Sequence, residues 1–108
     1  MTKNPKCVIN LVEDFSPYPG GRYEDNGPFS GEKFRTDILE PAMASSVVIT
    51  VDLDGAAAIA PSFLDESFGV IMERIGKDKF DKKFIILLTD DPDAIDDLNE
   101  IRHRRFKK

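Results

Sequence analysis

Acidic residues follow two apolar runs in the chain, and they are the first candidates for chemistry. Glu13 and Asp14 come after the first run, and Asp52 and Asp54 come after Val47–Val51. If both runs are strands, their ends could bring these carboxylates together in a Mg²⁺-dependent phosphoacceptor site. The chain has no Lys near the end of the later apolar run FIILLT, and aspartates commonly form turns. Turn formation is therefore the favoured interpretation.

A second candidate is an anion-binding site at the start of a predicted helix. Ser30 and Gly31 begin this helix, where free backbone amides attract negative groups, and Arg22 and Arg35 flank it. Guanidinium groups bind phosphate and carboxylate through paired hydrogen bonds. One hypothesis is a pocket for a small anion or nucleotide between these residues and Ser62. The alternative is a simple helix cap with surface arginines.

The sequence contains no recognisable catalytic set. His103 is the only histidine and no cysteine lies near it, so neither a zinc site nor a nucleophile–histidine pair can be assembled. The GxxxxGK[ST] and GxGxxG patterns of nucleotide-binding loops are missing. Asp65 and Glu66 project about 100° apart on a helix, which does not suit paired acid–base work. We expect a protein that is not an enzyme and uses no metal or cofactor.

One strand–turn–helix unit must position most of these residues. Val47–Val51 is β-branched and predicts a buried strand, and a turn follows at Asp52–Gly55. Ser62 and Asp65 have the spacing of a capping box, which predicts a helix that starts at Pro61 or Ser62. Its apolar side recurs at helical spacing and consists of Leu64, Phe68, Ile71, Met72 and Ile75. Glu66 falls away from that side and is expected to be exposed.

The flanking segments complete an α/β pattern. Strands are predicted over 7–12 and 84–89, and a helix over 31–43 that ends or bends at Pro41. Another helix is predicted to start with Asp91 as its cap. We expect a small mixed or mostly parallel sheet of about four strands packed against about three helices. One core should hold nine residues, namely Phe34, Ile49, Val51, Leu64, Phe68, Ile71, Ile86, Leu88 and Leu98.

The connecting segments have their own signals. Residues 15–29 are rich in Pro, Gly, Asp and Asn and predict a long ordered loop or an irregular hairpin. Gly76 is expected to be a helix C-cap. The charged segment 77–83 is interpreted as a connection in which Phe80 anchors the chain.

Composition and charge narrow the setting of the protein. The chain has 108 residues, 41% hydrophobic and 32% charged, so a single domain over residues 1–108 is expected. No segment has the length of a membrane span, the start lacks an apolar signal region, and Cys7 is the only cysteine, so we expect a cytoplasmic protein. A net charge of −5 argues against general nucleic-acid affinity. The basic end from Arg102 to Lys108 is interpreted as complementing a helix dipole.

Two segments resemble a known family. The VDLDG turn followed by SFLDESFG, and PGGRYEDNGPFSGEKFR from Pro19 to Arg35, resemble the STAS-like domain family of unknown function. That family is similar to the STAS domains of anti-sigma-factor antagonists and sulfate transporters. The resemblance implies a STAS-like fold and a bacterial, regulatory interaction module. Its partner would be a regulatory protein of the kinase or ATPase type, with no membrane and no nucleic acid, and a homo-oligomer is left open.

The same resemblance implies which residues meet the partner. STAS antagonists present their strand–turn–helix surface, which in this chain contains Pro61, Ser62, Phe63 and Glu66. Pro61 falls where the antagonists carry their phosphorylated serine, so Ser62 is the neighbouring hydroxyl that could be phosphorylated. We expect Ser62 to act as a structural cap and the surface to dock constitutively.

Overall fold

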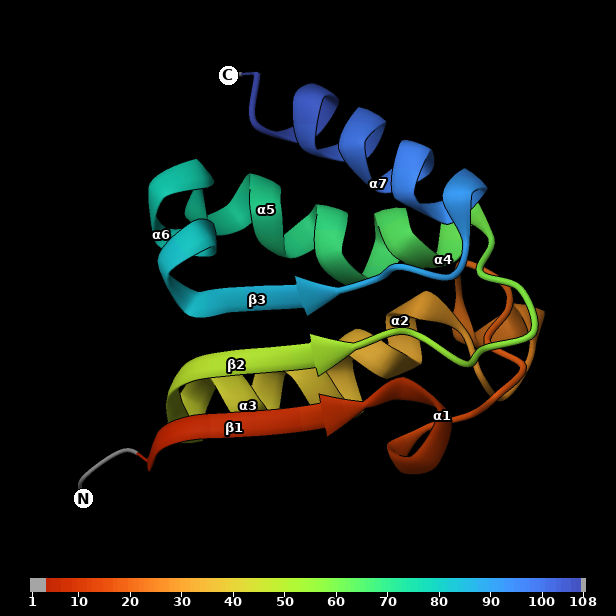
Figure 1. The fold of residues 1–108 in the computed structure, drawn as a ribbon, viewed down its shortest axis with the longest axis horizontal. Coiled ribbons are helices and arrows are strands. Elements are labelled where there is room, and N and C mark those ends of the chain that lie inside the picture. The colour runs from red at the N-terminus through yellow and green to blue at the C-terminus, as the bar shows by residue number, and fades with distance from the viewer. Residues whose placement is uncertain (1–3, 108) are drawn as a thin grey trace.

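Three parallel strands form the single sheet of the protein (Figure 1). The structure is a computed structural model that describes residues 4–107, so the Met1–Lys3 start and Lys108 of the basic end lie outside the described residues. The strands are β1 (Asn4–Asn10), β2 (Ser46–Asp52) and β3 (Phe84–Leu87), with β2 in the centre. The described residues thus give three strands and not the expected four. The segment 15–29 is a loop with one 3₁₀ turn, η1 (Glu24–Asn26).

The first strand ends earlier than predicted because Asn10 caps a short helical turn. This turn, α1, spans Leu11–Asp14, and the Asn10 side chain accepts a hydrogen bond from the Glu13 amide. Asparagine favours such caps, which compete with the sheet for the backbone. Residues 11 and 12 were predicted to be strand, and they belong to this turn.

The first long helix runs from Gly31 to Ser45 as α2 (Gly31–Phe34), η2 (Arg35–Leu39) and α3 (Glu40–Ser45). Ser30 is its N-cap, as predicted, and accepts a hydrogen bond from the Lys33 amide. The helix continues past Pro41, which the sequence predicted as an end or bend. The intervening η2 is a π turn in which the Glu40 amide bonds to the Arg35 carbonyl five residues back. A widened turn tolerates the missing proline amide better than a regular one.

The second long helix consists of α4 (Pro61–Leu64), η3 (Asp65–Gly69) and α5 (Val70–Ile75), and η3 is again a π turn. Gly76 ends it at a φ of 84°, which confirms the predicted C-cap. The next seven residues were interpreted as a connection, but they form a helix, α6 (Lys77–Lys83), with Phe80 buried.

The last helix, α7 (Pro92–Arg105), begins as predicted. The Asp91 side chain accepts a hydrogen bond from the Ala94 amide, and Pro92 occupies the first turn, where its missing amide costs nothing. Within residues 4–107 no helix combines the length and the apolar character needed to cross a membrane.

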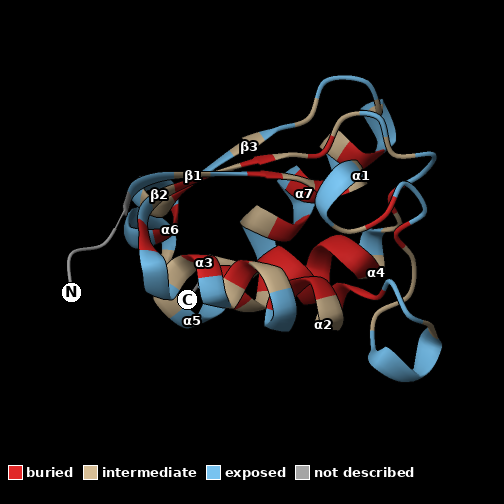
Figure 2. Cartoon of the chain, turned by 90° about the horizontal axis from the view of Figure 1, so that it is seen from below, coloured by how far each residue is buried: buried red, intermediate tan, exposed pale blue. Residues whose placement is uncertain are grey.

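The helices lie on one side of the sheet, which leaves the other side open (Figure 2). In that view α2, α3, α4 and α5 lie below the strands, and α7 packs against α4, η3 and α5. The core between the layers contains seven of the nine predicted residues as buried side chains, and Ile86 and Leu88 pack partly buried against it.

All eight phenylalanines form one continuous set of ring contacts through this core. Phe29 contacts Phe15, and Phe15, Phe34 and Phe63 contact one another with centroids 5.1–6.2 Å apart. The contacts then continue from Phe34 through further rings, namely Phe68, Phe84, Phe80 and Phe106. We call this set the phenylalanine chain. It joins the loop 15–29 at one end of the molecule to the end of α7 at the other.

Candidate functional site

The aspartates at the carboxyl ends of the strands are occupied in turns. Asp54 accepts hydrogen bonds from the Thr89 amide and hydroxyl and from the Asp90 amide, and these bonds lower the pKa of Asp54. Asp52 accepts from the Asp54 amide, and Asp14 accepts from the Asn10 amide. The favoured turn interpretation is confirmed for these three. Among residues 4–107 no group of three or more His, Cys, Asp or Glu side chains is placed to hold a metal ion.

The start of α4 differs from the predicted capping box. Ala60 is the N-cap, Pro61 is the first helical residue and Ser62 is the second, and no side chain caps this end. The prediction of Ser62 as a cap was therefore wrong. In the described part of the chain the Ser62 hydroxyl has no hydrogen-bond partner, and the side chain is half-buried. Only Pro61 and Ser62 of the four expected contact residues reach the surface.

Phe63 and Glu66 are buried, and their assignment to a partner surface was wrong. Phe63 is fully covered and belongs to the phenylalanine chain. Glu66 is 8% exposed, and its carboxylate lies 2.9 Å from the Nη2 of Arg35. The Arg35 Nε also donates to the Glu66 carbonyl at 3.0 Å. Arg35 lies on the π turn η2 and Glu66 lies on the π turn η3 that faces it, so this pair connects the two long helices.

Asp65 is the most strongly held charge of the described residues, and it is not the helix cap that the sequence predicted. Its carboxylate receives hydrogen bonds from Arg22, Arg104 and Arg105 at 2.7–3.1 Å. Burial alone would raise the pKa of Asp65, but the three guanidinium groups outweigh it and hold this pKa well below its ordinary value of 3.8. We call Arg22, Arg35, Asp65, Glu66, Arg104 and Arg105 the charged network.

The residues of the hypothetical anion pocket already have partners within the protein. Arg22 and Arg35 bind Asp65 and Glu66. The Gly31 amide donates to the Gly21 carbonyl, and the Glu32 amide donates to the Arg22 carbonyl. Gly31 also lies where α2 crosses α4, because a Cβ there would come within 2.5 Å of the Phe63 carbonyl oxygen. The geometry of this region is that of a packed helix junction.

A groove of about 540 Å³ lies beside the start of α4. One wall is the alanine-rich turn with Ile59 and Pro61, and the other is the start of α7. The acidic lining residues are Asp90, Asp91, Asp93 and Asp97. Within the described residues none of these four carboxylates takes part in a salt bridge. We call this feature the acidic groove.

Asp97 has a raised pKa among the acidic residues at the start of α7. Partial burial and then the like charges of Asp93, Glu100 and Asp91 raise the pKa of Asp97. From the sequence, the basic end of this helix was interpreted as a complement to its dipole, and its acidic start was not predicted to form a wall of a groove. The signal available was the position of this acidic run directly after a predicted buried strand.

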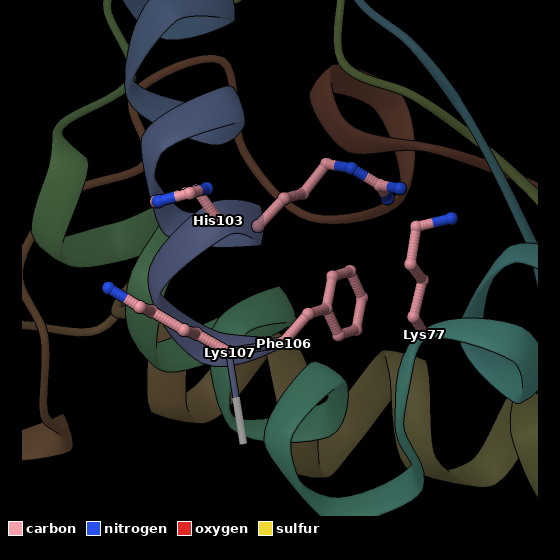
Figure 3. Close-up of a pocket in the computed structure, with 5 residues that line it drawn as sticks. Lys77, His103, Phe106 and Lys107 are labelled. Atoms are coloured by element: carbon pink, nitrogen blue, oxygen red, sulfur yellow. The ribbon is translucent and has the colours of Figure 1, made fainter.

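A basic pocket of about 380 Å³ lies at the opposite end of α7 (Figure 3). It is lined by Lys77, Arg102, His103, Phe106 and Lys107. The Arg102 guanidinium lies 5.1 Å from the centre of the Phe106 ring, and Arg102 and Lys77 both bind Asp81. Figure 3 shows the His103 and Lys107 side chains pointing away from the Phe106 ring. The cations therefore do not converge on one point.

Comparison with known proteins identifies one family. A family model described as a STAS-like domain of unknown function matches residues 30–94, which is more than half of the chain. The match includes the second long helix and much of the acidic groove. No curated protein and no solved structure matches the chain.

Proposed function

Because the chain belongs to the family of STAS-like domains of unknown function, we propose that it is a non-enzymatic regulatory domain that docks onto a partner protein. The docking surface in this proposal is the acidic groove together with Pro61 and Ser62. The observation that carries it is the four groove aspartates, which lie beside an apolar turn and form no salt bridge in the described part of the chain. We expect the partner to be a regulatory protein that offers a basic segment.

Electrostatic complementarity supports this choice of partner segment. A lysine- or arginine-bearing segment would neutralise Asp93 and Asp97, and charge pairs of this kind favour fast association and the choice of one partner over another. Alanine side chains on the opposite wall leave room for the stems of long basic side chains, which pack on apolar surface while their charged ends reach the carboxylates. The pairing would weaken with salt, because exposed charges are screened.

The location of the groove also supports docking. Parallel sheets commonly bind their ligands outside the carboxyl ends of the strands, and the turn that follows β2 forms one wall of the acidic groove. The docking surface expected from the sequence shares Pro61 with this groove. Because Phe63 and Glu66 are buried, the docking surface is centred on Pro61, Ser62 and the start of α7.

A pair of matched double variants tests the proposal. Asp93→Asn/Asp97→Asn removes two groove charges, whereas Asp96→Asn/Glu100→Gln removes two charges from the same helix outside the groove lining. Binding of a peptide of alternating lysine and alanine is measured by titration calorimetry, and capture of proteins from the native host is compared for the same variants. We expect the groove variant to bind the peptide about tenfold more weakly and the control to bind like the wild type.

The outcome that contradicts the proposal is equal loss in both double variants. That result would mean that the peptide responds to overall charge and not to the groove. If a host protein is captured equally well by the wild type and by Asp93→Asn/Asp97→Asn, the docking surface lies elsewhere on the protein.

No observation favours the small-anion or nucleotide alternative as a second function. Its arginines bind carboxylates of the same chain, and the Gly31 and Glu32 amides donate to backbone carbonyls. An incoming anion would have to displace Asp65 or Glu66 from partners that are already at hydrogen-bond distance.

A further inference from the structure

The open side of the sheet exposes apolar side chains interspersed with polar ones. Side chains alternate between the two faces of a strand, so Ile9, Ile49 and Val51 point into the core and their neighbours point the other way. On the open side Val8 is 71% exposed, Ile85 is 49% exposed and Leu87 is 44% exposed. Parallel sheets are usually covered on both faces. The open side of this sheet therefore lacks the covering layer that parallel sheets usually have.

The strand register brings these residues into rows. Val8 pairs with Thr50, and Thr50 pairs with Ile85, so three side chains form a row across the sheet. In the next row, nearer to the beginning of the strands, Lys6 pairs with Val48. In the row on the other side, nearer to the end of the strands, Asp52 lies between Asn10 and Leu87. We call these eight residues the open face.

The open face has opposite charges at its two ends. Lys6 lies at the end where the strands begin, and Asp52 lies four residues further along the register, about 13 Å away. Within the described residues neither side chain forms a salt bridge. A second open face with its strands running the opposite way would place its aspartate near this lysine and its lysine near this aspartate. The surface is thus complementary to itself.

We propose that two copies of the chain associate through the open face. The arrangement is a two-fold symmetric, isologous dimer in which the sheets stack about 10 Å apart with antiparallel strands. The row of Val8, Thr50 and Ile85 lies at the centre, and Lys6 of each copy lies near Asp52 of the other. This inference uses the opposite side of the sheet from the helices and does not depend on the acidic groove.

The size of the open face sets the strength of the association. Three strands about 4.8 Å apart and five residues of about 3.3 Å each give a flat area on the order of 250 Å². Standard interfaces bury about 800 Å² per partner, so even with the surrounding side chains this contact is small. The dimer is therefore weak and forms only at high protein concentration.

Sedimentation velocity over a series of protein concentrations tests the dimer. Two variants, each with one exposed valine replaced by glutamate, are compared with the wild type. Val8→Glu places a carboxylate in the central row of the open face, next to its own symmetry copy. Val47→Glu is the control, because Val47 is also exposed, at 52%, but belongs to the alternation of Ile49 and Val51 on the helix side. We expect the wild type and Val47→Glu to shift toward dimer with concentration and Val8→Glu to remain monomeric. Circular dichroism of each variant checks that the fold is retained.

A charge variant tests the antiparallel orientation. Lys6→Glu would bring a carboxylate near Asp52 of the other copy, so we expect its dimer dissociation constant to rise at least fivefold. High salt should weaken the wild-type dimer and strengthen that of Lys6→Glu, because screening removes attraction in one and repulsion in the other. A wild-type chain that stays monomeric at the highest concentration, or equal behaviour of Val8→Glu and Val47→Glu, would overturn the proposal. A dimer that is indifferent to Lys6→Glu would overturn the antiparallel arrangement.

Discussion

Two serines at helix starts show how similar residues serve different roles. Ser30 is fully buried, and its hydroxyl accepts the Lys33 amide, which would otherwise lack a partner at the helix end. Ser62 is one position inside its helix and leaves its hydroxyl without a partner in the described part of the chain. Ser62 is therefore not shielded from phosphorylation by a capping hydrogen bond, and constitutive docking stays a prediction.

Substitution by alanine separates the two serines. We expect Ser30→Ala to lower the free energy of unfolding by about 1 kcal/mol, because it removes a side-chain cap. Ser62→Ala should change it by less than about 0.5 kcal/mol. Urea titrations of both variants measure the difference. Equal losses would mean that Ser62 does cap its helix in solution.

Asp65 is the residue on which three separate segments converge. Arg22 comes from the loop before the first long helix, and Arg104 and Arg105 come from the end of the chain. Asp65 is buried, so removal of its charge would leave three guanidinium groups facing one another. Removing one partner of a buried ion pair usually costs much more folding free energy than removing one partner of an exposed ion pair.

We expect Asp65→Asn to lower the free energy of unfolding at neutral pH by about 2–4 kcal/mol, less than a fully buried pair because Arg104 is half exposed. Asp81→Asn is the matched control, since Asp81 also binds Arg102 and Lys77 but is partly exposed, and it should cost below about 1 kcal/mol. Guanidinium chloride is avoided because its salt screens the ion pairs, so urea is the denaturant. Comparable losses in the two variants would contradict the special role of Asp65.

The pH dependence of Asp65→Asn has a defined sign. The folded-state pKa of Asp65 lies below its ordinary value of 3.8, so the folded state binds fewer protons there than the unfolded state. Its stabilisation is complete above pH 3.8 and is lost as the pH falls toward the folded-state pKa. The wild type should therefore lose stability in this acid range more steeply than Asp65→Asn. Parallel curves for the two proteins would refute the assignment.

At the scale of the elements, the close crossing of the two long helices decides the arrangement. Gly31 begins α2 directly against the Phe63 carbonyl, and the two π turns carry the Arg35–Glu66 pair between the same helices. The crossing has no space for a side chain at residue 31. Glycine here serves close approach and not an unusual backbone angle.

Gly31→Ala should therefore destabilise the protein although alanine is the better helix former. The added methyl group meets backbone and not a flexible side chain, so we expect a loss of about 1–3 kcal/mol. Gly20→Ala is the control, because a Cβ there has nothing within 4 Å. Thermal unfolding followed by circular dichroism measures both. If Gly31→Ala melts at or above the wild-type temperature, the helices are further apart than described.

The short-range features of this fold were predictable from the sequence. The β-branched run in β2, the Ser30 and Asp91 caps and the Gly76 helix end each depend on a few neighbouring residues. The family resemblance was also confirmed by the family match. The π turns could not be predicted, because bonds five residues back are set by how two distant helices pack.

The candidate site was less predictable for the same reason. Residues 63–69 are all buried, so the helix is covered on the side that its sequence pattern marked as exposed. Glu66 and Asp65 are polar in sequence, and their partners Arg35 and Arg105 lie 31 and 40 residues away. Nothing local to Glu66 indicates such pairing. The acidic groove likewise combines two segments that are about 30 residues apart in the sequence.

At the scale of the whole molecule, the phenylalanine chain connects the layer of helices to the sheet. Phe68 is its middle member, fully buried between Phe34 from the first long helix and Phe84 from β3. Removal of this ring would open a cavity at the centre of the core and interrupt the chain.

We expect Phe68→Ala to lower the free energy of unfolding by about 3–5 kcal/mol, a large share of the stability of a small domain. Phe29→Ala is the control at the end of the phenylalanine chain, where the side chain is 40% exposed and the loss should stay near or below about 1 kcal/mol. Urea titration gives both values. A loss below about 1 kcal/mol for Phe68→Ala would show that this ring is not central to the core.

The distribution of aromatic residues also determines what optical methods can detect. The protein has no tryptophan, and both tyrosines, Tyr18 at 73% and Tyr23 at 51%, are exposed in the loop 15–29. Intrinsic fluorescence therefore comes from this loop, whereas the near-ultraviolet circular dichroism of packed phenylalanines comes from the core. Unfolding curves recorded by the two signals would coincide only if loop and core unfold together. Tyrosine emission thus monitors the loop independently of the core.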